Sequence, residues 1–440
     1  DALPIWICYN EWGDKMKEAF KVYYDFFKNI SRNVKLYLGI IFFATIVSSA
    51  YNVLFGIYMK NLGFNEAFVG QILSINTLGV ALGAIPVAIF AERINRKRTL
   101  IAGLLLMVVS NLIVLNVQIP FVMQVFAFLF GIGNSTLMVL QAPIIYDNTP
   151  DEHRVTAFSM AFVLQNIAFV IGSLVLGHLS QSLTGVMGAL GANRLVLNLA
   201  TSLIFIGVVI ALRFDGEQMT RGRKEDTIQQ TAKNLFAGFR RLTSGKTLFY
   251  LIQVSLIGLG AGMIVPFFSM YLKFTLETSD GVVGTIMAIS QVGTVIGGLI
   301  VPPLAKKIGR VNTVLACQLL SIPFLISISF PQGIIIITIS FFFRSSLMNM
   351  AGPVIGSLAM DIVDDETRTY MSSMVSLINN LFRSIGIYIG GYLMFAYNYN
   401  TPYYWTILCY LIGTVILYNV FKNVKDKPNG KQSLDKSSVG

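Results

Sequence analysis

The chain has 440 residues, of which 54% are hydrophobic and 12% charged, and its formal net charge is +11. A soluble domain is about one quarter charged, so this composition excludes a water-soluble enzyme and indicates the lipid bilayer as the solvent. The basic residues are spread between apolar segments and do not form one patch, which argues against a nucleic-acid-binding protein.

The N-terminal residues 1–35 are predicted to form a cytosolic arm, because they mix aromatic and charged residues and contain no signal-peptide core. Residues 18–34 have the pattern of an amphipathic helix lying on the membrane, and an ordinary packed arm explains them equally well. Twelve apolar segments follow, each long enough to cross about 30 Å of hydrocarbon. They span residues 36–59, 67–90, 99–117, 121–146, 155–179, 193–212, 247–272, 281–304, 311–330, 333–359, 370–396 and 402–421.

The remaining polar stretches divide the chain into two halves. Residues 213–246 are predicted to be a cytosolic linker between the two sets of six segments, and residues 422–440 a disordered cytosolic tail. If the N-terminus is cytosolic, the inside segments hold 28 of the 33 Lys and Arg residues. Because positive loops stay in the cytosol, both termini are expected to be cytosolic. The same charges are expected to attract anionic lipid headgroups.

The two halves repeat one another at an offset of 214 positions. VGQI at residues 69–72 matches VGTI at residues 283–286, and DEHR at residues 151–154 matches DETR at residues 365–368. Such a parallel repeat is one of the transporter architectures, with the substrate bound near the membrane midplane between the halves. The sequence therefore predicts an all-α membrane protein with twelve transmembrane helices in two six-helix pseudo-symmetric bundles. The bundles are expected over residues 36–212 and 247–421.

A charged turn between the second and third segments carries a family resemblance. Residues 91–98, AERINRKR, resemble the loop pattern G-x-x-x-D-R-x-G-x-R-R of the major facilitator superfamily, and LAKKIGR at residues 304–310 is a degenerate copy. The sequence departs from the pattern at Ala88, Glu92 and Asn95, where the pattern has Gly, Asp and Gly. After Gly, Asn is the residue that best tolerates a left-handed turn. The resemblance covers residues 36–421 and implies a secondary transporter that works by rocker-switch alternating access.

The same turn is a candidate conformational latch. By resemblance, the Glu92 carboxylate pairs with basic groups and helix ends across the two halves and holds the outward-facing state. A plain positive-inside hairpin is the alternative. For the charges that follow the fourth and tenth helices, solvated loop charge is an equally good reading. The candidate latch residues are Glu92, Arg93, Arg96, Lys97, Arg98, Asp147, Arg154, Asp361 and Arg368.

Two arginines lie deep in predicted helices. Counting at 1.5 Å per residue places Arg344 and Arg383 roughly 15–18 Å from the membrane surface. An ionisable residue at that depth is by default a functional hypothesis. Because the tenth helix lines the central cavity in the superfamily that the chain resembles, Arg344 is expected to face substrate. The planar fork of arginine suits carboxylate or phosphate, so we expect an anionic or acid-bearing substrate. Arginines satisfied by helix ends and nearby amides are the alternative.

Several uncharged polar side chains also lie within the predicted helices. In hydrocarbon they need partners or water, so they are candidates for a cavity, although interhelical hydrogen bonds explain any single one of them better. With the two arginines, the predicted substrate-binding residues are Tyr51, Asn52, Asn134, Gln165, Asn166, Gln253, Gln291, Asn349 and Asn380.

The leading function is therefore a membrane transporter for a small organic solute, with no catalytic residues, no cofactor and no metal. Its three cysteines are too few and too scattered for a metal site. A multidrug or amphipathic-compound exporter of the same superfamily is the alternative, weakened because no carboxylate stands at the midplane. A sensor that binds without transporting is less favoured. The sequence leaves open whether an ion is coupled to transport. We expect a functional monomer in a cell membrane, the bacterial inner membrane, without a nucleic-acid partner.

Overall fold

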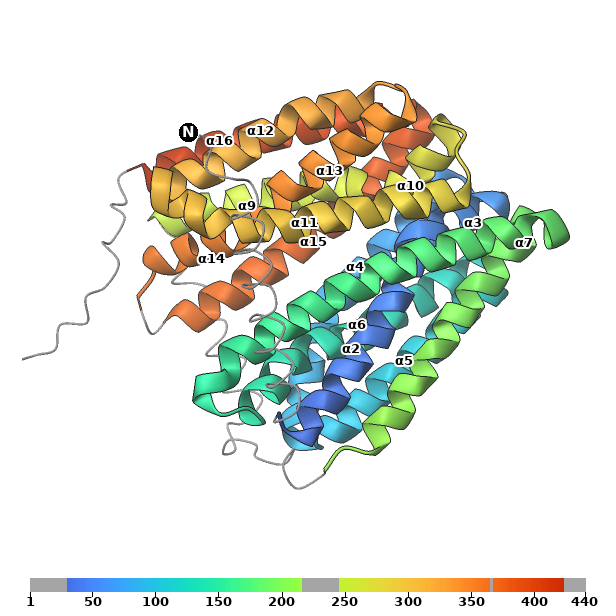
Figure 1. Ribbon diagram of the computed structural model, residues 1–440, viewed down its shortest axis with the longest axis horizontal. Helices are drawn as coiled ribbons and strands as arrows, with labels where there is room; N and C mark the ends of the chain where they lie inside the picture. Colours follow the sequence, from blue (N-terminus) through green and yellow to red (C-terminus); the bar gives the residue numbers. More distant parts are fainter. Residues whose placement is uncertain (1–29, 216–244, 365–366, 423–440) are drawn as a thin grey trace, which may run out of the picture.

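The computed structural model describes residues 30–215, 245–364 and 367–422. The predicted amphipathic arm up to residue 29, most of the predicted linker, and all of the predicted tail but its first residue lie outside these ranges. Within them, the chain forms helices joined by short turns (Figure 1).

The first half is built from helices that follow the predicted segments closely. Its first crossing joins α2, a π-helical turn and α3. The elements are α2 Arg32–Ala50, η1 Tyr51–Phe55, α3 Gly56–Asn61, α4 Glu66–Arg93, α5 Arg96–Asn116, α6 Pro120–Asp147, η2 Asp151–His153 and α7 Arg154–Leu212.

The second half repeats this order, and its first and fourth crossings are each divided. The elements are α9 Gly245–Ile264, η3 Val265–Phe267, α10 Phe268–Met270, η4 Tyr271–Thr275, α11 Asp280–Ile308, α12 Arg310–Ser329, α13 Ile334–Met350, α14 Gly352–Asp361, α15 Arg368–Ala396 and α16 Thr401–Phe421.

These helices provide twelve membrane crossings. Ten helical segments are long and apolar enough to span a bilayer, and one of them, residues 151–212, is 62 residues long and turns back on itself. The sequence predicts a break over residues 180–192, whereas helical structure continues on both sides of a reversal at Gly188, with φ 74° and ψ 164°. The 29-residue α15 is more polar and packs against α4 and α9. The prediction of an all-α, twelve-helix membrane protein in two halves is confirmed.

We call the end of the molecule with residues 61–66, 275–280 and 397–400 the outer end, and the opposite one the inner end, following the predicted orientation. At the outer end, Asn65 and Ser279 cap the starts of α4 and α11 by accepting hydrogen bonds from backbone N–H groups. At the inner end, Asn95 has φ 153° and Gly309, 214 positions later, has φ 87°. Asn95 thus has a positive φ at the position where the second copy of the turn has a glycine.

The repeat extends to the contacts inside each half. Tyr58 donates a hydrogen bond to the Leu115 carbonyl at 2.5 Å, and Tyr271 donates to the Ile328 carbonyl at 2.5 Å. Both phenols are fully buried. In the membrane a buried hydroxyl needs such a partner. The same hydrogen bond between the first and third crossings is therefore present in both halves.

Glycine allows two helix backbones of the first half to approach closely. A Cβ on Gly131 of α6 would lie 2.1 Å from the Asn76 carbonyl oxygen of α4. We predict that Gly131→Ala lowers stability by about 1–3 kcal/mol, because the two backbones have to separate. Gly185→Ala is the matched control, since a Cβ there meets nothing within 4 Å. Thermal unfolding of the detergent-solubilised variants measures both, and equal melting temperatures would contradict this packing.

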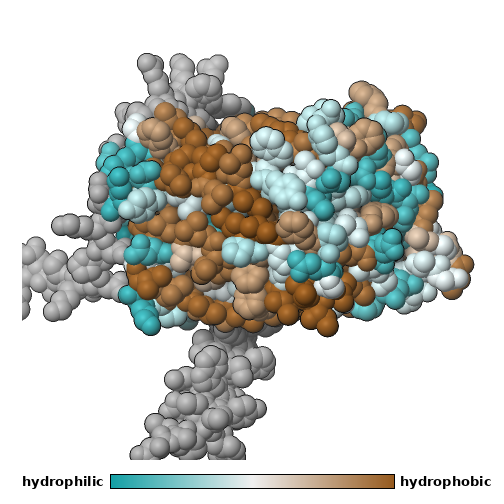
Figure 2. All heavy atoms as spheres, turned by 90° about the horizontal axis from the view of Figure 1, so that it is seen from above, coloured by the Kyte–Doolittle hydropathy of each residue, from teal (hydrophilic) through white to brown (hydrophobic). Residues whose placement is uncertain are grey.

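The two halves converge at the outer end and diverge toward the inner end (Figure 1). Between them, α4 packs against α15 and α7 against α11. Gly70 approaches Gly391 and Gly177 approaches Gly284, so backbones meet directly at both interfaces. Hydrophobic residues cover much of the face in Figure 2. Leu299 and Val415, for instance, are 74% and 60% exposed, as expected for side chains that contact lipid.

Candidate substrate site and outer gate

A cavity of about 320 Å³ lies between the halves at the depth of the two buried arginines. Most of its wall comes from α9, α11, α13, α15 and α16 of the second half. Its lining combines apolar side chains with a set of polar and charged ones, and such polar groups orient a ligand in small-molecule sites. The lining residues are Asn52, Phe169, Ile257, Ala261, Val265, Phe268, Met287, Ser290, Gln291, Thr294, Arg344, Ser345, Met348, Asn349, Asn379, Arg383 and Tyr410.

Arg344 is buried in this wall between Tyr410 and Phe268. Its residue is 4% exposed, its NH2 group donates to the Tyr410 hydroxyl at 3.2 Å, and its guanidinium carbon lies 5.1 Å from the centre of the Phe268 ring. The Nε–H is buried and donates to no described residue. A buried cation with an unfilled donor is costly unless a hydrogen-bond acceptor completes its coordination, and an anion also compensates the charge.

Arg383 enters the same cavity from α15. At Arg383, α15 packs closely against α9. A Cβ on Gly262 of α9 would lie 2.3 Å from the Arg383 carbonyl oxygen. Among the described residues, neither Arg383 nor Arg344 forms an ion pair with a carboxylate. Two cations thus share one cavity wall without an internal counter-ion.

The cavity brings together five of the eleven residues predicted to bind substrate: Arg344, Arg383, Asn52, Gln291 and Asn349. Asn166 lies directly behind Gln291 and accepts a hydrogen bond from it. The other five do not line this cavity. Tyr51 stacks on Phe55, Gln165 pairs with Gln141, Asn380 bonds its own helix, Gln253 is buried in α9, and Asn134 lies on α6.

Sequence reasoning missed the residues that shape the cavity around the arginines. Tyr410 orients Arg344, and Phe268, Phe169 and Met287 supply apolar wall. Aromatic and Met residues are so frequent in these helices that no local signal separates them from lipid-facing side chains. The pairing of Arg344 with Tyr410, 66 positions later, exists only in the folded chain.

The predicted latch residues at the inner end pair within their own halves. Arg96 binds Asp147, and at the repeated position Arg310 binds Asp361 at 2.8 Å. Arg154 lies over the Tyr146 ring at 3.4 Å and pairs with Asp151 at 2.6 Å. Lys97 donates to the Phe214 carbonyl at 2.7 Å. These contacts brace the ends of the helices in each bundle.

Glu92, at the end of α4, lies where the halves have diverged. It is exposed, like Arg93 and Arg98, and among the described residues it forms no ion pair. Arg368 begins α15 on the opposite half. The two halves are separated at the inner end, where Glu92 lies. A latch at Glu92 would join the halves there.

At the outer end, two acidic clusters join the halves. Glu66, the first residue of α4, binds Lys60 at 2.6 Å and accepts a hydrogen bond from Tyr399 of the second half at 2.6 Å. Burial and this hydrogen bond to the Glu66 carboxylate raise the pKa of the Tyr399 phenol, so Tyr399 stays protonated and is the donor of the hydrogen bond. The carboxylate therefore ties the turn before α16 to the start of α4.

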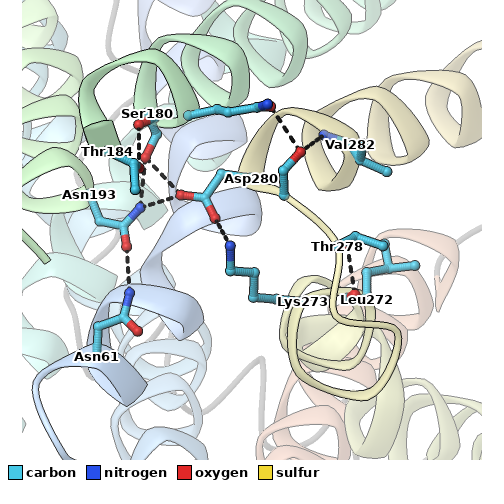
Figure 3. Close-up of polar contacts among 11 residues, drawn as sticks. Asn61, Ser180, Thr184, Asn193, Leu272, Lys273, Thr278, Asp280 and Val282 are labelled. Carbon is cyan, nitrogen blue, oxygen red and sulfur yellow. Dashed lines mark hydrogen bonds and ion pairs between the residues drawn. The ribbon is translucent and has the colours of Figure 1, made fainter. Parts of the chain in front are cut away.

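Asp280, the first residue of α11, occupies the repeated position and is 3% exposed. Lys273 Nζ of its own half lies 2.8 Å from one carboxylate oxygen. The other oxygen accepts hydrogen bonds from Ser180 and Asn193 of the first half, at 2.8 Å and 2.7 Å. Figure 3 shows the Asp280 carboxylate between Lys273 and these two donors, with Asn61 bonded in turn to Asn193. We call the Glu66 and Asp280 clusters together the outer gate.

The repeat contains the signal that could have found the outer gate. Glu66 and Asp280 are 214 positions apart, the same offset that aligns the other motifs, and Lys60 and Lys273 precede them. Both copies retain an acid at the start of a crossing, beside one of the few outer lysines. This pattern indicates the same structural role in both halves. That the acids reach across to the opposite half is visible only in the structure.

The fold is a transporter architecture, with twelve crossings, a repeated half and a central cavity. A sequence comparison identifies the family. A model of the Major Facilitator Superfamily matches residues 37–257 and 250–438. The chain belongs to the Major Facilitator Superfamily. The predicted resemblance is thereby confirmed, and the protein is a multi-pass membrane protein of this transporter superfamily. No curated protein matches the chain in sequence.

Solved structures with the same fold include several transporters of this superfamily. The crystal structure of the nucleoside transporter NupG has a TM-score of 0.72 at 16% identity, covering 90% of this chain and 100% of that one. An inward-facing, occupied bacterial homologue of the human lysosomal transporter Spinster has a TM-score of 0.70 at 14% identity, covering 88% and 96%. The peptide transporter POT in complex with sulfate has a TM-score of 0.67 at 14% identity, covering 89% and 95%. At these identities the likeness concerns the fold alone.

Proposed function

We propose that the protein is a secondary transporter that moves a small organic anion by alternating access, with its site in the cavity between the bundles. The observation that carries this proposal is Arg344, a buried guanidinium with an unfilled Nε–H, which shares a cavity wall with Arg383 and no carboxylate. An anionic substrate would supply the missing acceptors. Arginine binds carboxylate or phosphate through a planar fork, whereas a cationic drug would meet two like charges.

The cavity suits a compact organic anion. A volume of about 320 Å³ lies at the small end of ligand sites, so the substrate is a metabolite-sized molecule. Asn52, Gln291 and Asn349 offer hydrogen bonds, and Phe169 and Phe268 offer apolar contact. The proposed substrate therefore combines one acidic group with an uncharged organic body.

The arrangement of the halves supports an inward-facing state of a rocker-switch cycle. The outer gate and the glycine contacts close the outer end, and the hydrogen bonds between the halves extend inward as far as Ser74–Ser384 and Asn166–Gln291. In the outward-facing state these contacts would open, and Glu92 would come within reach of the opposite half. The pairs Arg96–Asp147 and Arg310–Asp361 each lie within one bundle, so a movement of one bundle against the other leaves them intact.

We propose that both termini lie in the cytosol of a cell whose inner membrane holds the protein, and that it functions as a monomer. The support is the excess of Lys and Arg at the inner end. Membrane and solute are then the partners that the mechanism requires.

Counterflow in proteoliposomes tests this function. Vesicles preloaded with unlabelled benzoate, with inorganic phosphate or with a cationic dye would be assayed for uptake of the same labelled compound. We expect accumulation for an anion and none for the cation. Accumulation of the dye alone would favour the multidrug exporter, and anion binding without counterflow would favour a sensor.

The latch is tested by Glu92→Gln. If Glu92 holds the outward-facing state, its loss shifts the bundles toward the inward-facing state. The accessibility from the outer end of a cysteine introduced in the cavity wall, Met287→Cys, then falls at least about threefold while folded yield is unchanged. An exposed surface pair supplies at most about 1 kcal/mol, which sets this size. Asp364→Gln, an exposed acid at the same end, is the control. Equal accessibility in both variants would show that the turn is a plain positive-inside hairpin and not a latch.

A further inference from the structure

The cavity wall is strongly unequal between the two halves. Both arginines and most other lining residues belong to the second half, and the first half contributes Asn52 and Phe169. A ligand changes the balance between two conformations only through contacts that differ between them. An anion held mainly by Arg344 and Arg383 therefore needs a further connection to the first half.

Gln291 provides such a connection. Its side chain lines the cavity from α11, and its Nε2 donates a hydrogen bond to Asn166 Oδ1 of α7 at 2.6 Å. Asn166 is 6% exposed, and its own Nδ2 donates to the Phe162 carbonyl at 2.7 Å, which fixes the amide so that its oxygen faces Gln291. One N–H of Gln291 is thus committed to the first half, and the second N–H is available to an acceptor in the cavity.

The position of this bond makes it responsive to movement of the halves. On the α7–α11 side it is the innermost of the hydrogen bonds described between the bundles, at the level where they diverge. On the α4–α15 side the innermost is Ser74–Ser384, at 3.0 Å, and Ser384 directly follows Arg383. The arginine cavity therefore lies beside the innermost described hydrogen bonds between the bundles on both sides.

We propose that Gln291 connects the bound anion to the first half by donating one N–H to the anion and the other to Asn166, so that Asn166 is a positioning residue outside the substrate contact. The proposal rests on the function proposed above and deepens it. Hydrogen bonds in such a chain polarise and strengthen one another, so occupancy of the cavity tightens the bond between the halves. The second half then binds the anion, and the hydrogen bond from Gln291 to Asn166 transmits its binding to the first half.

The test separates binding from transport. Asn166→Leu and Gln291→Leu would be assayed singly and together for the Kd of benzoate and inorganic phosphate in detergent, and for kcat and KM of counterflow. Spin labels at Val155→Cys and Lys307→Cys, both exposed at the inner ends of α7 and α11, would report the distance between the halves with and without the anion. Asn111→Leu is the matched control, because it removes a buried amide hydrogen bond to Thr201 within the first half.

We expect Asn166→Leu to leave Kd within about threefold of the wild type, to lower kcat at least about tenfold, and to abolish the anion-induced change in label distance. The double variant should have the kcat of Asn166→Leu alone, since both changes break one connection. A normal kcat and distance change in Asn166→Leu would overturn the proposal and leave anion transport intact. A loss equal to that of Asn111→Leu would also overturn it. Absence of anion binding by the wild type would overturn both this proposal and the proposed function.

Discussion

Arg344→Gln is expected to raise the Kd of benzoate and of inorganic phosphate at least about tenfold, and to abolish their counterflow. A hydrogen bond to a charged group contributes about 1.5–3 kcal/mol, which corresponds to roughly 10–150-fold in affinity. The same change should leave the melting temperature of the anion-free protein unlowered. Gln removes a buried cation that has no carboxylate partner among the described residues, and this gain offsets the lost hydrogen bond to the Tyr410 hydroxyl.

The two measurements together separate a binding role from a structural one. If Arg344 serves only to hold Tyr410 and Phe268 in place, the variant loses stability and keeps its relative affinity for anions. Arg344→Lys retains the charge without the fork and should fall between the wild type and Gln. Arg194→Gln is the control, because Arg194 lies at the outer end and bonds Asn116. Unchanged affinity for every anion in Arg344→Gln would contradict the anion site.

Asp280→Asn is expected to open the outer gate. The substitution removes the ion-pair partner of Lys273 and turns an acceptor of two hydrogen bonds from the first half into a group that also donates. Removing one partner of a buried ion pair costs about 3–5 kcal/mol. Ser180 and Asn193 donate to residue 280 only with the outer end closed. The weakening of these two hydrogen bonds, unlike the loss of the Lys273 pair within one half, should therefore appear as a shift toward the outward-facing state.

The shift is measured by the distance between spin labels at Val186→Cys and Tyr397→Cys, which are exposed on opposite halves of the outer end. We expect the population with the longer distance to rise at least tenfold, which corresponds to about 1.4 kcal/mol. Glu277→Gln is the matched control, an exposed acid three residues before Asp280 in the same turn. An Asp280→Asn variant with the wild-type distance distribution would show that the glycine contacts alone keep the outer end closed.

Some features of the site could be predicted from the sequence, and the reason is geometric. Distance along a helix is proportional to residue number, so counting from the turns places Arg344 and Arg383 near the same depth, and the structure puts both in one cavity. The angle around a helix is also periodic, but which face meets the cavity depends on the neighbouring helices. Gln165 and Asn166 are adjacent, yet one pairs with Gln141 inside the first half and the other with Gln291 across the interface.

The sequence by itself determined the twelve crossings and the repeat, and it predicts the orientation. The length of an apolar segment and the charge of a turn are local properties, and membrane insertion depends on them directly. Only the tertiary structure decided which charged groups meet. Asp147 and Asp361 pair within their own halves, whereas Glu66 and Asp280 reach across to the other. All four lie at helix ends, and the relative placement of two packed bundles determines which partner lies within hydrogen-bond distance.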